Sequence, residues 1–329
     1  MLAVERPNTN LPGHPATLVL GELNVDLVLQ GDVVPEFGQR EKWLEGASLA
    51  LGSSGAIFAC GTSRLGLFTA YLGRLGQDTF GRFVVERMAE RGVDVSSILV
   101  DREETTGISV ILSRGQDRAI LTYLGRGLDR RDADTICATL GGFSHLHVSS
   151  YFLNIGLQPI LSEVFQLAKG MGLSTSLDPN WDPAQEWNGR LVTEVLPHTD
   201  IFFPNENEAQ AISGVEGVEA AAERLAGKAK IVVVKRGLEG AMARWGSKVC
   251  SFPALPVESI DSTGAGDSFD AGFLCGYLNG WPLRSCLALG CASGALSTTR
   301  IGGPNGQPTL QEALTLLEER GYSELIPPR

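Results

Sequence analysis

The segment best suited to chemistry is the glycine-rich run 261–267, which reads Asp-Ser-Thr-Gly-Ala-Gly-Asp. The run is followed by apolar residues at helical spacing, which predicts a buried helix beginning near Asp267. The free N–H groups of such a first turn suit an anion, and glycines let the backbone approach it closely. A carboxylate at this position would take the proton of an attacking hydroxyl, while the amides of Gly264, Ala265 and Gly266 stabilise charge on a transferring phosphoryl group.

The competing interpretation of this run is purely structural. Gly264 and Gly266 would form an ordinary turn and Asp267 would cap the helix, which is the commoner explanation of an isolated Gly-x-Gly-Asp sequence. The chemical interpretation therefore depends on motifs elsewhere in the chain.

The composition excludes several classes of function. With 27 basic and 38 acidic residues, the net charge is −11, which disfavours binding to nucleic acid or to an anionic membrane surface. The six cysteines show neither metal-ligand spacing nor a dense disulfide framework. Residues 1–16 contain three prolines and lack the apolar stretch of a signal peptide. We therefore expect a flexible segment over 1–16 and a cytoplasmic protein that contacts neither nucleic acid nor membrane.

The elements that must position the glycine-rich run alternate between strands and helices. This alternation is typical of a mostly parallel sheet with helices on both faces, so we expect an α/β fold, a three-layer α/β/α sandwich, in one domain over 17–329. The predicted strands are Thr17–Leu23, Phe68–Gly73, His145–Ser149, Ser174–Asp178, Ile201–Phe203, Ile231–Lys235, Ala241–Trp245 and Lys248–Phe252. The predicted helices are Ala56–Leu65, Gly81–Arg91, Gly156–Met171, Glu206–Ser213, Val218–Ala229, Asp267–Leu278, Leu283–Ser297 and Leu310–Glu319.

Two stretches interrupt this alternation. Residues 27–49 lack helix signals, and residues 106–124 alternate apolar and polar side chains around a predicted turn at Arg114–Asp117. Together they predict a small β-sheet that covers the mouth of the main domain as a lid. An exposed strand of this lid could pair across a homodimer.

Signatures at both ends of the chain support the chemical interpretation of the glycine-rich run. Residues 261–267 follow the form D-T-x-G-A-G-D, with Ser262 as a mild departure, and the N-terminal half carries a second set of motifs at residues 52–59, 64–66, 72–78 and 80–81. In these residues, and from Gly21 to about Gly303, the chain resembles the ribokinase-like (PfkB) family of sugar and nucleoside kinases. The resemblance implies a ribokinase-like fold with a β lid and an ATP-dependent kinase whose catalytic base is Asp267.

The resemblance also implies contacts to the acceptor. Asn24 and Asp26 look like the family's ligands for substrate hydroxyls, and Gly52 and Ser53 fall in its acceptor-binding loop. An amide and a carboxylate two positions apart at the end of the first strand would point the same way and could grip vicinal hydroxyls. As an isolated pair, they would more simply be a turn asparagine and a solvated aspartate.

Contacts to the nucleotide are implied by the same resemblance. Lys235, Gly237 and Gly240 lie in a turn similar to the family's nucleotide-binding turn, for which a plain hairpin is the alternative. Asn205 and Thr263 are further predicted nucleotide contacts. The stretch 292–303 resembles the segment that lines the adenine pocket, although its apolar residues would also suit a core helix.

Two cation sites are implied as well. Asn205 and Glu208 match the family's N-x-x-E motif, which implies that they organise Mg²⁺ through its waters; the same residues could simply form a capping box. Asp261 and the carbonyl of Thr263 fall where relatives hold a monovalent cation, such as K⁺.

The sequence departs from the family pattern at informative places. Ser53 and Ile57 stand where the N-terminal signature has glycine and asparagine, so one expected hydrogen bond to a sugar is missing and the substrate is left open. Asp182 replaces a frequent arginine, which argues mildly against an acidic or phosphorylated acceptor. His145 and His147 alternate on one strand, and because no third ligand lies nearby we predict core histidines rather than a metal pair.

We therefore expect an ATP- and Mg²⁺-dependent carbohydrate kinase whose substrate is a sugar or sugar derivative. One alternative is a nucleoside kinase, because aromatic residues near the lid, such as Trp43 and Tyr123, could stack on a base. Another is a catalytically idle, sugar-binding regulator. A dinucleotide-binding reductase is disfavoured because no G-x-G-x-x-G follows the first strand.

Overall fold

The computed structural model describes residues 16–327, except 115–116 and 188. Of the N-terminal segment expected to be flexible, residues 1–15 lie outside the described residues, and Ala16 already begins the first strand. The centre of the predicted Arg114–Asp117 turn also lies outside them. Within the described part of the chain, no helix combines the length and the apolar character needed to cross a membrane.

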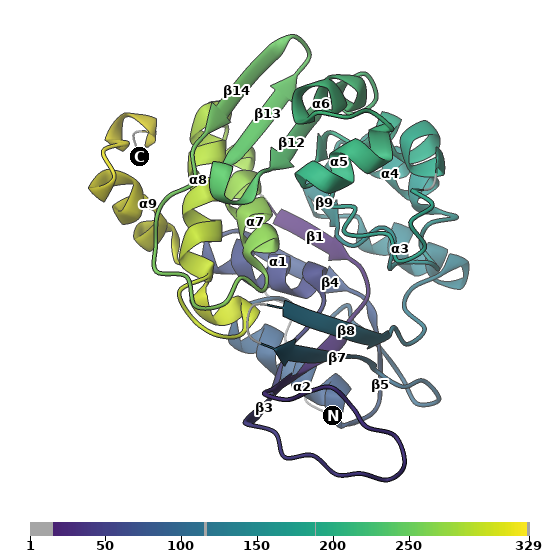
Figure 1. Cartoon of the computed structure of the whole chain (residues 1–329). Coiled ribbons are helices and arrows are strands. Elements are labelled where there is room, and N and C mark those ends of the chain that lie inside the picture. Colours follow the sequence, from purple (N-terminus) through teal and green to yellow (C-terminus); the bar gives the residue numbers. More distant parts are fainter. Residues whose placement is uncertain (1–15, 115–116, 188, 328–329) are drawn as a thin grey trace.

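An eight-stranded sheet forms the centre of the molecule, in the order β14-β13-β12-β11-β10-β9-β1-β4 (Figure 1). The six strands from β12 to β4 are parallel, and β13 and β14 form an antiparallel edge. Their bounds are β1 Ala16–Leu20, β4 Phe68–Leu72, β9 His145–Val148, β10 Ser174–Leu177, β11 Ile201–Phe202, β12 Ile231–Lys235, β13 Ala241–Trp245 and β14 Lys248–Phe252. Every residue of β1 is buried, as expected for a parallel strand covered on both faces.

Hydrophobic cores lie on both faces of this sheet. One gathers α1 (Ser54–Arg64), α2 (Thr79–Glu90), α7 (Ala265–Leu278), α8 (Leu283–Ser297) and α9 (Leu310–Glu319). The other gathers α3 (Ala133–Thr139), α4 (Leu161–Gly170), α5 (Glu206–Ser213) and α6 (Val218–Ala226). The predicted α/β/α sandwich is therefore confirmed.

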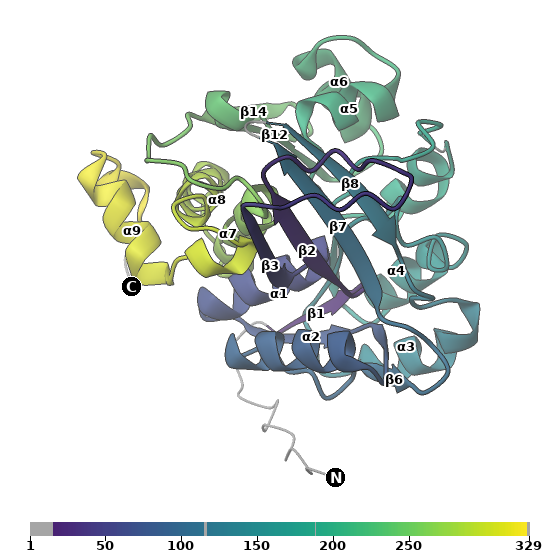
Figure 2. The ribbon, with the colours of Figure 1, turned by 60° about the horizontal axis from the view of Figure 1, so that its bottom comes forward.

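A smaller four-stranded sheet, which we call the lid sheet, lies in front of the main sheet (Figure 2). β2 (Asn24–Gln30) pairs antiparallel with β3 (Gly46–Leu51) and parallel with β7 (Gly107–Arg114), and β7 pairs antiparallel with β8 (Asp117–Tyr123). Both segments predicted to break the α/β alternation contribute strands. A further pair, β5 (Arg74–Gly76) and β6 (Leu99–Asp101), is separate from both sheets.

Two predicted boundaries are wrong in ways that matter. The first core strand ends at Leu20, so Asn24 and Asp26 lie on β2 of the lid sheet and not at the end of a core strand. The helix expected from Gly156 begins only at Leu161, because a proline at 159 cannot occupy a helix interior.

Candidate functional site

The glycine-rich run leads into the first turn of α7. Gly264 is the N-cap residue, with a φ of 73° that suits glycine, and the helix begins at Ala265, two residues before the predicted start. Asp267 lies inside the helix and does not occupy the N-cap position that the structural interpretation gave it. Its Oδ1 instead accepts a hydrogen bond from the hydroxyl of Ser54 on α1.

The environment of Asp267 favours proton transfer near neutral pH. Burial and the nearby Asp178 carboxylate raise the pKa of Asp267 to about 7, while Ser54 and Lys235 act in the opposite direction. A carboxyl group whose pKa lies near the working pH is suited to general-base catalysis.

Lys235 is the central cation of this region. At the end of β12, its Nζ donates hydrogen bonds to Asp178 Oδ2 at 2.6 Å and to Asp270 Oδ2 at 3.0 Å. Burial alone would lower the pKa of Lys235, but Asp178, Asp270 and Glu208 raise it above its ordinary value. Asp270 Oδ1 is buried without a hydrogen-bond partner among the described residues. More than one carboxyl group therefore surrounds the single ammonium group of Lys235.

Asn205 and Glu208 form the capping box of α5. Asn205 Oδ1 accepts from the Glu208 amide at 2.9 Å, and Glu208 Oε2 accepts from the Asn205 amide at 2.8 Å. Asn205 also forms a β-bridge with Lys235. Burial and the Asp178 charge raise the pKa of Glu208 to about 7. The capping box thus exists, and it places Glu208 at the edge of the acidic group around Lys235.

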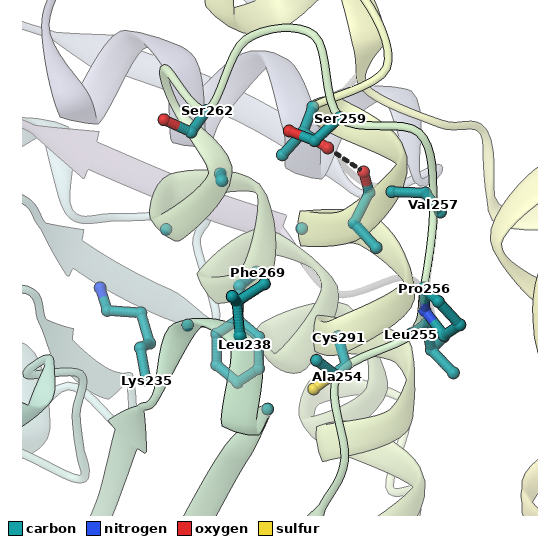
Figure 3. Close-up of a pocket in the computed structure, with 17 residues that line it drawn as sticks. Lys235, Leu238, Ala254, Leu255, Pro256, Val257, Ser259, Ser262, Phe269 and Cys291 are labelled. Carbon is teal, nitrogen blue, oxygen red and sulfur yellow. Dashed lines mark hydrogen bonds between the residues drawn. The ribbon is translucent and has the colours of Figure 1, made fainter. Parts of the chain in front are cut away.

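A cleft of about 690 Å³ adjoins the start of α7 (Figure 3). Its lining includes Lys235, Gly237 and Gly240, three of the five predicted nucleotide contacts, whereas Asn205 and Thr263 are immediate neighbours of lining residues. In Figure 3, Lys235 and the 254–257 segment lie on opposite sides of Phe269. The turn after β12 is indeed a hairpin, but one whose glycines open onto this cleft. From the predicted adenine-pocket segment, Gly294, Ala295 and Thr298 line it.

Three of the four predicted acceptor residues, Asn24, Asp26 and Gly52, meet at one face of the lid sheet. Asn24 Nδ2 donates to Asp26 Oδ1 at 3.1 Å and to Ser109 Oγ at 3.0 Å, and Ser109 Oγ lies 3.0 Å from Thr122 Oγ1. Gly52 approaches this group so closely that a Cβ atom there would clash with Asn24 and Asp26. Burial raises the pKa of Asp26 to about 6. We call Asn24, Asp26, Ser109 and Thr122 the polar lid face.

Asp261 and Thr263 brace the glycine-rich run. Asp261 Oδ1 accepts from the amide and the hydroxyl of Thr263 at 2.9 and 2.7 Å, and Oδ2 accepts from the amide of Gly302 at 2.8 Å. Burial would raise the pKa of Asp261, but these hydrogen bonds hold it below its ordinary value. The Thr263 hydroxyl also accepts a hydrogen bond from Arg118 of β8 at 3.3 Å.

With this geometry established, comparison with known proteins identifies the family. Residues 17–310 match the pfkB family carbohydrate kinases. The chain belongs to this family.

Individual relatives show how far the similarity extends. This carbohydrate kinase is 30% identical to the ribokinase of Haemophilus influenzae over 325 residues, covering 91% of this chain and 97% of the relative. It is 31% identical to a fructokinase of Klebsiella pneumoniae over 312 residues, covering 88% and 95%. The structure of Arabidopsis thaliana ribokinase complexed with ribose and ATP matches its fold with a TM-score of 0.81 at 23% identity, covering 93% and 99%.

The two departures from the N-terminal family signature have clear structural settings. Ser53 has a φ of 65°, a backbone conformation that glycine adopts easily, and its hydroxyl both caps α1 and donates to the Glu22 carbonyl at 2.6 Å. Ile57 packs its side chain beneath Gly264 of the glycine-rich run and against Gly303. In this carbohydrate kinase, residue 57 therefore packs against the glycine-rich run.

The two alternating histidines, His145 and His147, belong to the core. His145 and His147 are fully buried, with ring nitrogens 2.7 Å from serine hydroxyls, and His147 stacks on Phe58. Burial lowers the pKa of His145 to about 3. Over the described ranges, no three histidine, cysteine, aspartate or glutamate side chains converge as a metal site. The prediction of core histidines agrees with this geometry.

Sequence reasoning missed two residues of the site. Ser54 and Arg118 contact Asp267 and Thr263 across 213 and 145 positions of the chain, respectively. No sequence motif at either residue indicates a contact with so distant a part of the chain, although Ser54 lies inside the N-terminal signature. Alternation along β8 could have placed Arg118 on the same face as Thr122.

Proposed function

We propose that this carbohydrate kinase transfers the γ-phosphoryl group of ATP to a hydroxyl of a sugar or sugar derivative, with Asp267 as the base. The observation that carries the proposal is the position of Asp267 between two sites. On one side, Ala265 and Gly266 of the same helix line the 690 Å³ cleft. On the other, Asp267 lies close enough to Asp26 of the polar lid face for their charges to interact.

Each part of this arrangement has a role in the proposed transfer. The cleft holds the nucleotide, with the hairpin glycines Gly237 and Gly240 against it. The first-turn amides of α7 stabilise the charge of the transferring group. Asp267 removes the proton of the acceptor hydroxyl, and closure of the lid sheet keeps water from the phosphoryl group.

Mg²⁺ fits the residues at this site. Four carboxyl groups, those of Asp178, Glu208, Asp267 and Asp270, share the single ammonium of Lys235, and one buried oxygen of Asp270 has no partner within the described residues. Glu208, with Asn205 beside it, would hold Mg²⁺ through water, since this ion keeps much of its hydration shell. Bound there, Mg²⁺ would neutralise phosphate charge. We keep Asp261 and the Thr263 carbonyl as a proposed site for a monovalent cation such as K⁺.

The polar lid face supports a polyol as acceptor. Asn24, Asp26, Ser109 and Thr122 present amide, carboxylate and hydroxyl groups, which suit sugar hydroxyls. Tyr123 follows Thr122 on β8 and therefore projects from the opposite face of the sheet, which weakens the case for base stacking there. Because Arg118 places a positive charge on the lid sheet, an acceptor that carries an acidic group is again a candidate.

The test is ADP release from ATP and Mg²⁺ with a panel of pentoses, hexoses, sugar acids and nucleosides, using wild type and Asp267→Asn. We expect turnover with at least one sugar or sugar acid and a loss of about 10²- to 10⁴-fold in kcat for Asp267→Asn. Turnover of nucleosides alone would overturn the sugar assignment. Sugar binding without turnover would favour the idle regulator.

Two further features are proposed for the whole protein. Leu27, Leu49, Val110, Leu121 and Tyr123 lie on the face of the lid sheet opposite the polar one, and we propose that this face pairs in a homodimer. All six cysteines lie in the described part and are free thiols, which supports a cytoplasmic location.

A further inference from the structure

The start of α1 is held firmly beside the site. Ser53, its N-cap, accepts a hydrogen bond from the Ala56 amide at 3.3 Å and donates one to the Glu22 carbonyl at 2.6 Å. Ser53 adopts a positive φ to do so, a costly conformation for a residue with a side chain. Ser54 follows as the first residue of the helix, and its position is fixed by these contacts.

Ser54 points from α1 to the glycine-rich helix. Its hydroxyl donates a hydrogen bond to Asp267 Oδ1, linking the first turns of α1 and α7. The N-terminal end of α1 also carries partial positive charge, which favours a carboxylate in front of it. The bond occupies Oδ1 and leaves Oδ2 available to a second partner.

Ser54 stands out because the other groups that interact with Asp267 are ionisable. The interacting groups are Asp270 on the same helix, Asp178 after β10, Lys235 on β12, Glu208 on α5, Tyr71 on β4, Asp26 on β2 and Glu22 between β1 and β2. All but Lys235 are acidic, and Lys235 donates its hydrogen bonds to Asp178 and Asp270. Across the described residues, Ser54 is the side chain that donates a hydrogen bond to the Asp267 carboxylate.

We propose that Ser54 is the positioning residue of the base, an inference that rests on the proposed function. By holding Oδ1, it fixes the plane of the Asp267 carboxylate so that Oδ2 faces the acceptor hydroxyl. The hydroxyl proton passes to Oδ2, the acceptor oxygen forms a bond to the γ-phosphorus, and the bond between that phosphorus and the β–γ bridging oxygen breaks. ADP leaves with the electron pair of the broken bond.

The proposal makes Ser54 act on the chemical step rather than on binding. Without its hydroxyl, Asp267 rotates freely and loses a hydrogen bond that favours its charged form. Misplacement of a reacting group by about 1 Å costs on the order of 100-fold in rate. Loss of the hydrogen bond also raises the pKa of the base, so more alkaline conditions are needed to deprotonate it.

The experiment compares wild type, Ser54→Ala and Ser54→Thr, with Ser63→Ala at the other end of α1 as the matched control. For Ser54→Ala we expect kcat to fall about 10- to 100-fold while the KM values for ATP and acceptor stay within about twofold. The rising limb of kcat/KM against pH should move to higher pH. Ser54→Thr, which keeps the hydroxyl, should recover most of kcat, and Ser63→Ala should match wild type.

Several outcomes would overturn the role of Ser54. One is a kcat of Ser54→Ala equal to that of wild type. Another is a change in this variant that affects KM alone, and a third is a lower kcat with a pH profile of kcat/KM that does not move. Wild-type turnover in the same assay separates this failure from failure of the proposed function, because an inactive wild type would reject the kinase assignment itself.

Discussion

Arg118, on strand β8 of the lid sheet, donates a hydrogen bond from Nη1 to the hydroxyl of Thr263 in the glycine-rich run, 3.3 Å away. The charge of Arg118 also acts on Asp26 of the polar lid face and on Asp261, the first residue of the run. One side chain therefore connects the polar lid face with the glycine-rich run.

We expect Arg118→Ala to weaken closure of the lid sheet over the acceptor. The KM for the acceptor should rise about 3- to 10-fold, which is the range of an ordinary hydrogen bond, because this bond is exposed and 3.3 Å long. Arg82→Ala is the matched control, since Arg82 makes a similar exposed bond of 3.3 Å to the Thr79 hydroxyl on α2. Equal steady-state kinetics for the two variants would contradict a role for Arg118 in the site.

Gly52→Ala should damage acceptor binding, because the added Cβ atom would clash with both Asn24 and Asp26. We expect at least a tenfold loss in kcat/KM for the acceptor and a destabilisation of about 1–3 kcal/mol from overpacking. Gly170→Ala serves as the control, since its Cβ atom would meet nothing within 4 Å. A fully active Gly52→Ala enzyme would show that the polar lid face does not hold the acceptor.

Lys235→Ala should destabilise the fold strongly. The substitution leaves two buried carboxylates, Asp178 and Asp270, without their cation, at a cost of about 3–5 kcal/mol in the free energy of unfolding. Lys169→Ala should cost less, because Lys169 pairs with one carboxylate within the described part of the chain, that of Asp200, and its side chain is 37% exposed. Urea unfolding of both variants measures the difference, and equal losses would count against a buried charge cluster.

Glu22 predicts a dependence of stability on pH. Burial raises the pKa of Glu22 to about 8, from an ordinary value of 4.5. Between these values the folded chain keeps a proton that the unfolded chain releases, so this residue contributes less stability as pH rises, by up to about 1.4 kcal/mol per pH unit. The Glu22→Gln side chain does not titrate. Asn154 Nδ2, which donates a 2.7 Å hydrogen bond to Glu22 Oε2, can still donate to the side-chain oxygen of the glutamine.

The Tm of Glu22→Gln minus that of wild type should therefore increase from pH 5 to pH 8. The same difference for Glu41→Gln, an exposed glutamate in the 31–45 segment, should stay constant. A constant difference for Glu22→Gln would mean that this carboxyl group is ionised throughout.

The proposed homodimer is tested at Leu121, which is 63% exposed on the lid sheet. If the apolar face pairs two copies, wild type should have twice the 35.1 kDa mass of one chain by light scattering, and Leu121→Lys should shift toward the single mass. Val100→Lys, at a 57% exposed position on β6, is the control. A wild-type mass of one chain would reject the dimer.

Elements with strong local signals were predicted correctly. Strands β12, β13 and β14 and helices α5, α8 and α9 have the predicted bounds, because their apolar patterns are regular and their ends carry clear signals. The capping boxes at Asn205 and Thr309 are examples. Helix α3 was missed, since seven residues give only about two turns of periodicity.

The boundary between β1 of the main sheet and β2 of the lid sheet was harder to predict. Apolar residues continue through Leu23 and Val25, so local pattern does not separate β1 from β2. The contacts of Ser54 and Arg118 depend on how distant elements pack, which no local spacing records. Motif residues such as Asp267 were recognisable, whereas the side chains that orient them required coordinates.

The placement of Asn24 and Asp26 on β2 also bears on how this enzyme could diversify. The polar lid face comes from residues 24–122, whereas Asp267 and the lining of the cleft come from residues 235–298. With the acceptor on the polar lid face, as proposed, substitutions that change acceptor specificity can accumulate in the N-terminal half of the chain while the cleft stays unchanged. Substitutions on the three strands β2, β7 and β8 would then change the acceptor, while the residues that act on the phosphoryl group stay the same.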